Sequence, residues 1–358
     1  MAPEITADQP SRSDRSTLLY GDLMRVCGAI AVVVLHAAAG GVVRFGSISN
    51  ADWWTYNILD SACRWAVPVF LMLSGAVLLS PRDSEPLREF YAKRLARVGY
   101  PLLFWSVLYL LYANRGFSPT RAMSNAAAAV AVGTPYYHLY FLFVLLGLYL
   151  FVPVFRVVTQ HLSQKRLLVF AALSLTVASG DSLMHTFGEE RPNALSLFVP
   201  YIGYFFLGFA LRDMTLLPAK ERVCGLLAAV SLALTAGGTG LIVYQWGITR
   251  WGLFLYSPFS PTVIGMSACL FLLFVTAASR PQNFSRFSNA RLSALGGSTL
   301  GIYLLHPLIL DLLQKRGFVA ASFAPPVYLT VAILVPLVVS LLFTLLLQRL
   351  GPLKRLTG

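Results

Sequence analysis

The sequence has few charged residues. Asp, Glu, Lys and Arg make up 12% of its 358 residues, whereas soluble domains carry roughly 25%. Hydrophobic residues reach 57%, aromatic residues reach 13%, and the mean hydropathy is +0.68. This balance excludes an ordinary soluble domain. It indicates a protein that lies in the lipid bilayer, with Trp and Tyr side chains gathered at the two interfaces.

Cysteine is scarce as well, and its placement excludes a disulfide framework. Cys27, Cys63, Cys224 and Cys269 all fall inside apolar runs, and there is no CxxC motif and no Cys/His pairing. Such residues are typical of buried structural thiols rather than of zinc ligands. We therefore predict no metal site.

The short motifs of many catalytic sites are also missing. The chain has no Gly-rich phosphate loop, no HExxH and no GxSxG, which are the signatures of nucleotide, zinc-protease and serine-hydrolase sites. Paired interrupted half-helices, which indicate a transporter site, are not evident. A net charge of +13 suits a nucleic-acid partner, but the bases lie in short loops between apolar runs, so we predict no nucleic acid.

Ten apolar runs are present instead. A bilayer core of about 30 Å needs about 20 apolar residues per helix, and an Ala-rich segment at 122–132 is too short to span, so we expect it to be interfacial or re-entrant. The sequence predicts an all-α integral membrane protein, a bundle of about ten transmembrane helices. The expected spans are 18–40, 57–79, 97–113, 136–158, 166–180, 195–212, 222–244, 259–278, 296–316 and 326–350.

The distribution of Lys and Arg predicts the orientation. With the N-terminus in the cytoplasm, nineteen of the 28 bases lie on the cytoplasmic side, seven lie outside and two lie within spans. This asymmetry places both termini in the cytoplasm of a multi-pass protein of the inner (plasma) membrane. We expect a disordered cytoplasmic tail over residues 1–16, a transmembrane domain over 17–350 and a second cytoplasmic tail over 351–358.

The first span resembles a signal peptide, but it is too long and carries Asp22, Arg25 and His36, so we interpret it as a retained helix. Asp22 and Arg25 are spaced to form an ion pair. Arg25 and His36 are separated by about three turns, or about 16 Å of rise, and share one face. A helix that faces lipid does not hold three such residues cheaply, so this face is expected to line a protein interior or a watery cavity.

Two further groups of polar residues lie near the ends of the next spans. Asp60 either orients His36, as a carboxylate does for a catalytic imidazole, or pairs with Arg64 at i,i+4 spacing; the second alternative is favoured. Pro68 is expected to kink this helix and free carbonyl groups. At the cytoplasmic mouth, Lys93, Arg94 and Arg97 form a basic cluster that suits the phosphates of CoA, although the positive-inside rule also predicts bases there.

Taken together, these residues resemble the acyltransferase-3 family of ten-helix membrane proteins. The family's first-helix pattern is an Arg, ten residues and a His, and its other landmarks follow in the same order from about residue 18 to 350. Tyr140 stands where relatives often carry Trp, and no esterase domain of the SGNH type is fused. The landmarks in this chain are Arg25 with His36, the run Val67–Gly75, the basic stretch Lys93–Arg97 before Pro101, the run His138–Leu142 and the run Ile302–Pro307.

The resemblance implies a function. Acyl-CoA, most simply acetyl-CoA, is the expected donor, and a hydroxyl of a polysaccharide or other cell-surface glycan is the expected acceptor, so a glycan synthesis or export machinery is a possible partner. His36 is the expected general base and Arg25 the residue that positions the donor, while Arg64, Lys93, Arg94 and Arg97 contact the CoA. His138 and His306 are expected at the substrate. The alternatives are a transporter or flippase for an acylated or anionic metabolite, and a structural partner in an export complex, which leaves Arg25 and His36 unexplained.

Overall fold

The chain folds into a bundle of helices. A computed structural model describes residues 12–80, 85–187, 193–280 and 286–358, and in these ranges the regular elements are all helical. Nine helical segments of the described chain are long and apolar enough to cross a membrane, and Val199–Leu211 is a shorter apolar one. The ten segments coincide with the ten predicted spans. The prediction of an all-α multi-pass membrane protein is confirmed.

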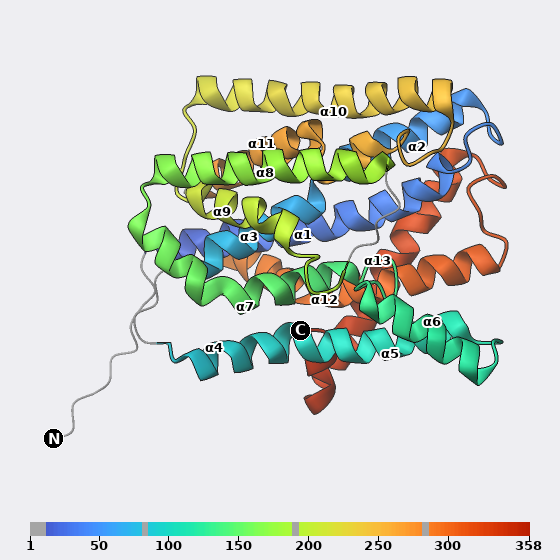
Figure 1. Ribbon diagram of the computed structural model, residues 1–358, viewed down its shortest axis with the longest axis horizontal. Helices are drawn as coiled ribbons and strands as arrows, with labels where there is room; N and C mark the ends of the chain where they lie inside the picture. The colour runs from blue at the N-terminus through green and yellow to red at the C-terminus, as the bar shows by residue number, and fades with distance from the viewer. Residues whose placement is uncertain (1–11, 81–84, 188–192, 281–285) are drawn as a thin grey trace.

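The helices lie roughly parallel to one another, with the N-terminus at one end of the bundle (Figure 1). We call that end the inner end, because it carries the basic cluster that predicts the cytoplasmic side. The main helices are α1 (Arg12–Val42), α2 (Asn50–Cys63), α3 (Ala66–Leu78), α4 (Leu87–Arg94), α5 (Tyr100–Asn114), α6 (Pro119–Ala131), α7 (Tyr140–His161), α8 (Gln164–Phe187), α9 (Ile202–Leu211), α10 (Pro218–Trp246), α11 (Pro261–Ser279), α12 (Arg286–Lys315) and α13 (Pro325–Arg349).

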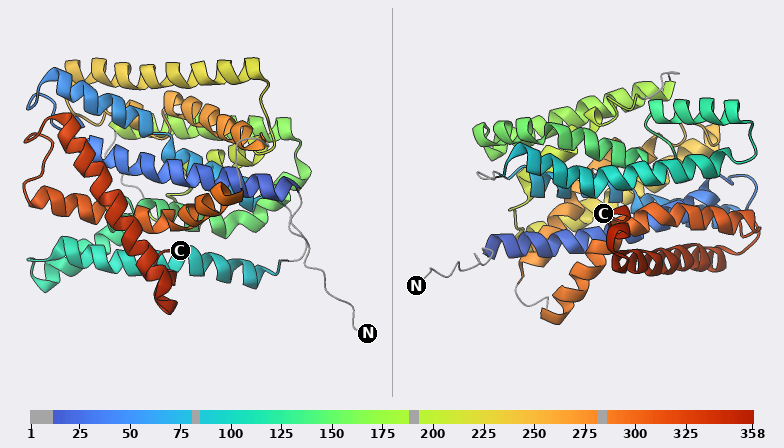
Figure 2. Two further views of the ribbon diagram at one scale, coloured as in Figure 1. Left: turned by 180° about the vertical axis from the view of Figure 1, so that it is seen from behind. Right: turned by 90° about the horizontal axis from the view of Figure 1, so that it is seen from below.

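Helix α1 occupies the interior of the bundle. It contacts α2, α3, α11, α12 and α13, and it runs through the middle of the molecule in Figure 1, while α13 crosses the other helices obliquely (Figure 2). Because protein surrounds α1, its polar residues face other helices rather than lipid. This arrangement agrees with the expectation that their face lines a protein interior.

The second predicted span is broken into α2 and α3. Pro68 has no backbone N–H, so the carbonyl of Arg64 loses the donor that a continuous helix would supply. The helix accordingly ends at Cys63 and resumes at Ala66. The break lies one turn before the proline, where the sequence predicts a kink, and it sets Arg64 free of a regular helical position.

The third span contains a second irregularity of the same origin. Pro101 cannot donate to the carbonyl of Arg97, and residues Leu95–Gly99 form a short π-helix, η1, between α4 and α5. Single π turns within α-helices are frequent at functional sites. Here the π turn carries Arg97 and follows directly on Arg94, so two bases of the cluster lie at a local change in helix geometry.

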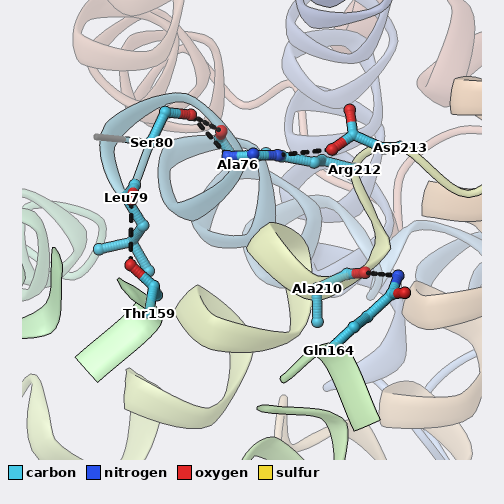
Figure 3. A network of polar contacts seen from close by, with 8 residues as sticks. All are labelled: Ala76, Leu79, Ser80, Thr159, Gln164, Ala210, Arg212 and Asp213. Atoms are coloured by element: carbon cyan, nitrogen blue, oxygen red, sulfur yellow. Dashed lines mark hydrogen bonds and ion pairs between the residues drawn. The ribbon is translucent and has the colours of Figure 1, made fainter. Parts of the chain in front are cut away.

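Side chains from other helices cap the inner end of α3. The carbonyl of Leu78 accepts from Arg156 Nε at 2.8 Å, and that of Leu79 accepts from Thr159 at 3.2 Å. Arg212 donates to the Ser80 hydroxyl at 2.6 Å, in a network with Asp213 that Figure 3 shows. Carbonyl groups at a helix C-terminus have no intrahelical donor, so these bonds fix α3 against α7 and the end of α9.

Helices α3 and α9 touch through glycine. A Cβ atom on Gly208 would collide with the backbone carbonyl of Met72, and one on Gly75 would collide with that of Phe205. Small residues at such positions let the backbones of membrane helices approach closely. Close van der Waals packing matters there because the hydrophobic effect does not drive helices together within lipid. The contact anchors the inner half of α3, the helix that carries Phe70, Leu73 and Ser74.

We expect Gly208→Val to destabilise the fold. Overpacking of a well-packed contact costs about 1–3 kcal/mol, and here the obstacle is backbone that cannot rotate away. The measurement is the thermal unfolding midpoint in detergent, with Gly237→Val on α10 as the control, because a Cβ there meets no atom within 4 Å. Equal midpoints for the two variants would contradict the role given to this contact.

The two ends of the chain differ from the predicted tails. Residues 1–11 lie outside the described residues, and residues 12–16 already belong to α1. At the other end, residues Gly351–Leu356 form a 3-10 helix, Thr357 is buried, and the Leu356 carbonyl accepts from the Trp105 indole at 2.9 Å. The last residues therefore pack against α5. Helix α6, in the Ala-rich segment, has no buried residue.

Candidate functional site

Three histidines from distant parts of the sequence meet inside the bundle. The ring of His36 on α1 stacks on that of His306 on α12, with centroids 5.3 Å apart, and His138, just before α7, lies 6.0 Å from His306. His138 and His306 are fully buried, and His36 is partly buried. We call these three residues the histidine cluster. The sequence singled out each one, and the fold brings them together.

The hydrogen bonding of His306 fixes which of its nitrogens carries the proton. Its Nδ1 lies 3.0 Å from the carbonyl oxygen of Ile302. A carbonyl oxygen only accepts, so Nδ1 must be the donor. In the neutral ring Nε2 is then an acceptor, and it has no hydrogen-bond partner among the described residues. An unsatisfied buried acceptor beside His36 is suited to receive a hydroxyl of a bound substrate.

Tyrosines surround the histidine cluster. Tyr137 packs edge-on against His36 at 5.0 Å, and Tyr303 lies 5.4 Å from His138 and 6.0 Å from His306. The Tyr303 hydroxyl donates to the backbone carbonyl of His138, which ties α12 to the start of α7. Tyr137 is 48% exposed, whereas His138 and His306 are fully buried.

A cavity of about 140 Å³ extends from Tyr303 toward the inner end of the bundle. Its walls come from α1, α3, the end of α4, η1, α7 and α12, and they are basic at one end and largely apolar elsewhere. We call it the inner cavity. The residues that carry its chemistry are Arg25, Ser74, Arg94, Arg97, Tyr149, Thr299 and Tyr303.

Of the five predicted donor-binding residues, Arg25, Arg94 and Arg97 line the inner cavity. Arg25 forms the predicted ion pair with Asp22 at 2.7 Å and keeps 25% of its side-chain exposure. Arg94, at the end of α4, and Arg97, in the π turn, line the same cavity. Guanidinium groups bind phosphates with paired, charge-assisted hydrogen bonds, so this end of the cavity is chemically matched to a phosphorylated ligand.

Lys93 is the member of the basic cluster that the cavity does not include. Its ammonium lies 2.7 Å from Glu89 and 3.3 Å from Glu85, and it does not line the inner cavity. Lys93 lies on a different face of α4 from Arg94, and two carboxylates already satisfy it. Lys93 is therefore not placed to contact a ligand in the inner cavity.

Asp60 pairs with Arg64, as the favoured alternative predicts. Arg64 donates to one oxygen of the fully buried Asp60 carboxylate, and its Nη1 donates to the Tyr256 carbonyl at 3.2 Å. The second carboxylate oxygen has no hydrogen-bond partner among the described residues, so the geometry does not make Asp60 the orienting partner of His36.

Arg64 also lies elsewhere than the donor prediction implies. Its guanidinium stacks on the Tyr256 ring at 4.1 Å and lines a second cavity, of about 310 Å³, together with α8 and the segment before α11. We call this the outer cavity. Arg64 therefore lines the outer cavity and not the inner one.

We expect Asp60→Asn to act on stability. Removing one partner of a buried ion pair costs about 3–5 kcal/mol, and the cost here lies near the lower end because Arg64 keeps some exposure. The double variant Asp60→Asn with Arg64→Gln should recover part of the loss, since no unpaired charge remains. Thermal unfolding in detergent measures both. A stable Asp60→Asn protein with an impaired turnover rate would instead indicate that Asp60 takes part in catalysis.

No group of three or more His, Cys, Asp or Glu in the described part of the chain is arranged to hold a metal ion. The four cysteines are free thiols.

A comparison with protein families decides the identity of the chain. The model of the acyltransferase-3 family, described as an acyltransferase domain, matches residues 18–345, which is nearly the whole sequence. The protein belongs to the acyltransferase-3 family. It is thus a membrane acyltransferase. No curated protein and no solved structure matches the chain at the threshold applied.

The site of this acyltransferase also contains residues that sequence reasoning did not select. Tyr303 precedes His306 by three residues, so helical spacing alone places it on the same face, and Tyr137 is the immediate neighbour of His138. Tyr256 gave no such signal. It ends a short 3-10 helix, η3 (Phe254–Tyr256), far along the chain, where its carbonyl and ring hold Arg64 and its hydroxyl donates to Asn57 at 2.5 Å.

Proposed function

We propose that this acyltransferase moves an acyl group, most simply acetyl, from cytoplasmic acyl-CoA to a hydroxyl of a glycan on the far side of the inner membrane or linked to a membrane lipid. One observation carries the proposal. A basic cavity at the inner end leads, through Tyr303, to three histidines in the interior of the bundle. A glycan synthesis or export machinery is the partner that would present such an acceptor.

The inner cavity suits the donor by size and charge. A volume of about 140 Å³ holds a narrow chain and not the whole of CoA. The nucleotide and its phosphates would remain at Arg94 and Arg97, while the pantetheine arm passes Arg25 toward Tyr303. The apolar walls, with Phe70 and Leu73 among them, exclude water from the thioester.

His36 is the proposed general base. Its ring is the least buried of the histidine cluster, and Nε2 of the neighbouring His306 is available as an acceptor. His36 takes the proton of the acceptor hydroxyl as the hydroxyl oxygen attacks the thioester carbonyl carbon. The C–S bond then breaks, and the CoA sulfur leaves with the proton from the imidazolium. The products are the ester and CoA with a free thiol.

A covalent route uses the same residues. The His36 imidazole attacks the thioester, CoA leaves, and the acyl-imidazole then passes the acyl group to the acceptor hydroxyl. The two routes differ in whether CoA is released before the acceptor reacts. A burst of free CoA equal to the enzyme concentration, together with an acyl-histidine trapped by acid quench, indicates the covalent route. A steady rate without a burst indicates direct transfer.

The experiment that tests the function uses purified protein in proteoliposomes and acetyl-CoA labelled in the acetyl group. Expected is saturable acetyl-CoA binding by calorimetry and label in an alkali-labile ester on added cell-surface glycan. Translocation of a compound without a new ester would favour the transporter or flippase. Folded protein that binds no acetyl-CoA would contradict the proposal that acyl-CoA is the donor.

A further inference from the structure

The segment that follows α13 is tied to the rest of the bundle. Residues Gly351–Gly358, which we call the strap, lie beside α5 and α12 (Figure 1). Thr357 is only 1% exposed, and its hydroxyl donates to the Lys354 carbonyl at 3.0 Å. Segments outside the main helices are usually exposed unless contacts hold them down, so the burial of Thr357 indicates a specific docking place.

The strap lies against two residues that line the inner cavity. A Cβ atom on Gly358 would lie 2.5 Å from the side chain of Leu300 and 3.4 Å from the carbonyl oxygen of Arg97. Both Leu300 and Arg97 line the inner cavity. The φ of Gly358 is +94°, a conformation that favours glycine. The close approach and the backbone conformation therefore both require glycine at this position.

The backbone beneath the strap lacks a regular helical hydrogen bond. Pro101 has no N–H and cannot donate to the carbonyl of Arg97 four residues earlier, and Leu95–Gly99 form the π turn η1. The strap approaches this same carbonyl. The Arg97 side chain is exposed and lines the inner cavity. The place of its guanidinium therefore depends on how firmly the neighbouring segments hold the π turn.

Trp105 fastens the strap to α5. Its indole Nε1 donates to the carbonyl of Leu356 at 2.9 Å, and the residue is only 2% exposed. One turn further along α5, the Tyr109 hydroxyl donates to the carbonyl of Leu304 on α12 at 2.7 Å. Because α5 continues directly from η1, these two bonds brace the π turn against the strap and against α12.

We propose that the strap positions Arg97 for the phosphates of the donor, and that Trp105 is a positioning residue that acts through the strap without touching the donor. This inference rests on the proposed function and adds a determinant of donor affinity. A guanidinium binds phosphate through paired hydrogen bonds of defined geometry, so a small displacement of the π turn weakens them. The pantetheine arm lies against walls from α3 and α7 and does not sense the same displacement.

Trp105→Phe tests the strap with little disturbance. It removes the indole N–H, keeps an aromatic ring beside Tyr109 and leaves every charge in place. The measurement is the Kd, by calorimetry in detergent, for acetyl-CoA and for S-acetylpantetheine, which carries the same thioester and no phosphate. We expect the acetyl-CoA Kd to rise about three- to tenfold, the effect of one hydrogen bond on an equilibrium constant. The S-acetylpantetheine Kd should stay unchanged.

Gly358→Val disturbs the strap at a second point. The added side chain would collide with Leu300 and strain a backbone conformation that favours glycine, so it displaces the strap without altering Trp105. We expect the same selective rise in the acetyl-CoA Kd. Wild-type affinity for acetyl-CoA in both variants would overturn the proposal.

Two controls separate this effect from more general ones. Trp246→Phe removes an indole N–H from an exposed residue at the end of α10 and should leave both Kd values at the wild-type level. Lys354→Gln with Arg355→Gln removes two positive charges from exposed residues of the strap and should keep the acetyl-CoA Kd within about twofold. A larger rise in that double variant would mean that the strap acts through its charge, which would overturn the positioning role.

A double-mutant cycle tests whether Arg97 is the residue that the strap positions. In an Arg97→Gln background, Trp105→Phe should leave the acetyl-CoA Kd unchanged, because residues that act through one contact are not additive. A rise by the same factor in both backgrounds would overturn the proposal. A proportional loss of both ligands with a lower thermal unfolding midpoint would also overturn it, since the strap would then only stabilise the fold.

The wild-type protein separates this inference from the proposed function. Normal acetyl-CoA binding in the wild type, with no selective loss in the strap variants, would reject the role of the strap alone. Folded wild-type protein that binds no acetyl-CoA would contradict the proposal that acyl-CoA is the donor, and it would reject this inference as well.

Discussion

His36→Ala is expected to lose acyl transfer by about 10²- to 10⁴-fold, the contribution that a positioned general base makes. The loss should fall on kcat, because the ring acts on the acceptor proton and does not contact the CoA phosphates. The measurement is the initial rate of ester formation from labelled acetyl-CoA, with acetyl-CoA affinity followed by calorimetry. Unchanged affinity with a collapsed rate is the expected pattern.

The control for this variant is His161→Ala. His161 is exposed at the end of α7, the opposite end of that helix from His138, and bonds to the Val157 carbonyl at 2.8 Å. It should transfer acyl groups at the wild-type rate. Wild-type turnover in His36→Ala would remove His36 from the mechanism, and His306 would then be the next candidate, because its Nε2 is an unpaired acceptor in the same cluster.

The double variant Arg94→Gln with Arg97→Gln is expected to raise the KM for acetyl-CoA about 10- to 100-fold with little change in kcat. Each substitution removes charge-assisted hydrogen bonds to phosphate, and two bonds of about 1.5 kcal/mol together change an equilibrium constant by a factor on the order of 100. Arg97 is exposed, so salt screening reduces its share.

Net charge alone could produce part of that effect, and a second double variant controls for it. Arg88→Gln with Lys93→Gln also removes two positive charges, both from α4, but neither residue lines the inner cavity. Its KM should stay within about twofold of the wild type, because charges this exposed interact weakly. Equal KM values for the two double variants would mean that Arg94 and Arg97 do not bind acetyl-CoA and that they only help to set the membrane topology.

Several features of the site can be predicted because they depend on local sequence. The ion pair of Asp22 with Arg25 and that of Asp60 with Arg64 follow from helical spacing, and both are present. The breaks near Pro68 and Pro101 follow from the missing N–H of proline. Tyr303 could have been selected in the same way, since it shares a helix face with His306.

The amino-acid sequence by itself determined that the chain spans the membrane many times, where the spans lie and which residues within them are costly to bury, because length and hydropathy decide insertion. Only the tertiary structure decided which of those residues meet. Helices α1 and α12 and the turn before α7 bring His36, His306 and His138 together, and Tyr256 holds Arg64 at the outer cavity. Contacts of this kind join positions hundreds of residues apart, and they depend on how helices pack rather than on any spacing along the chain.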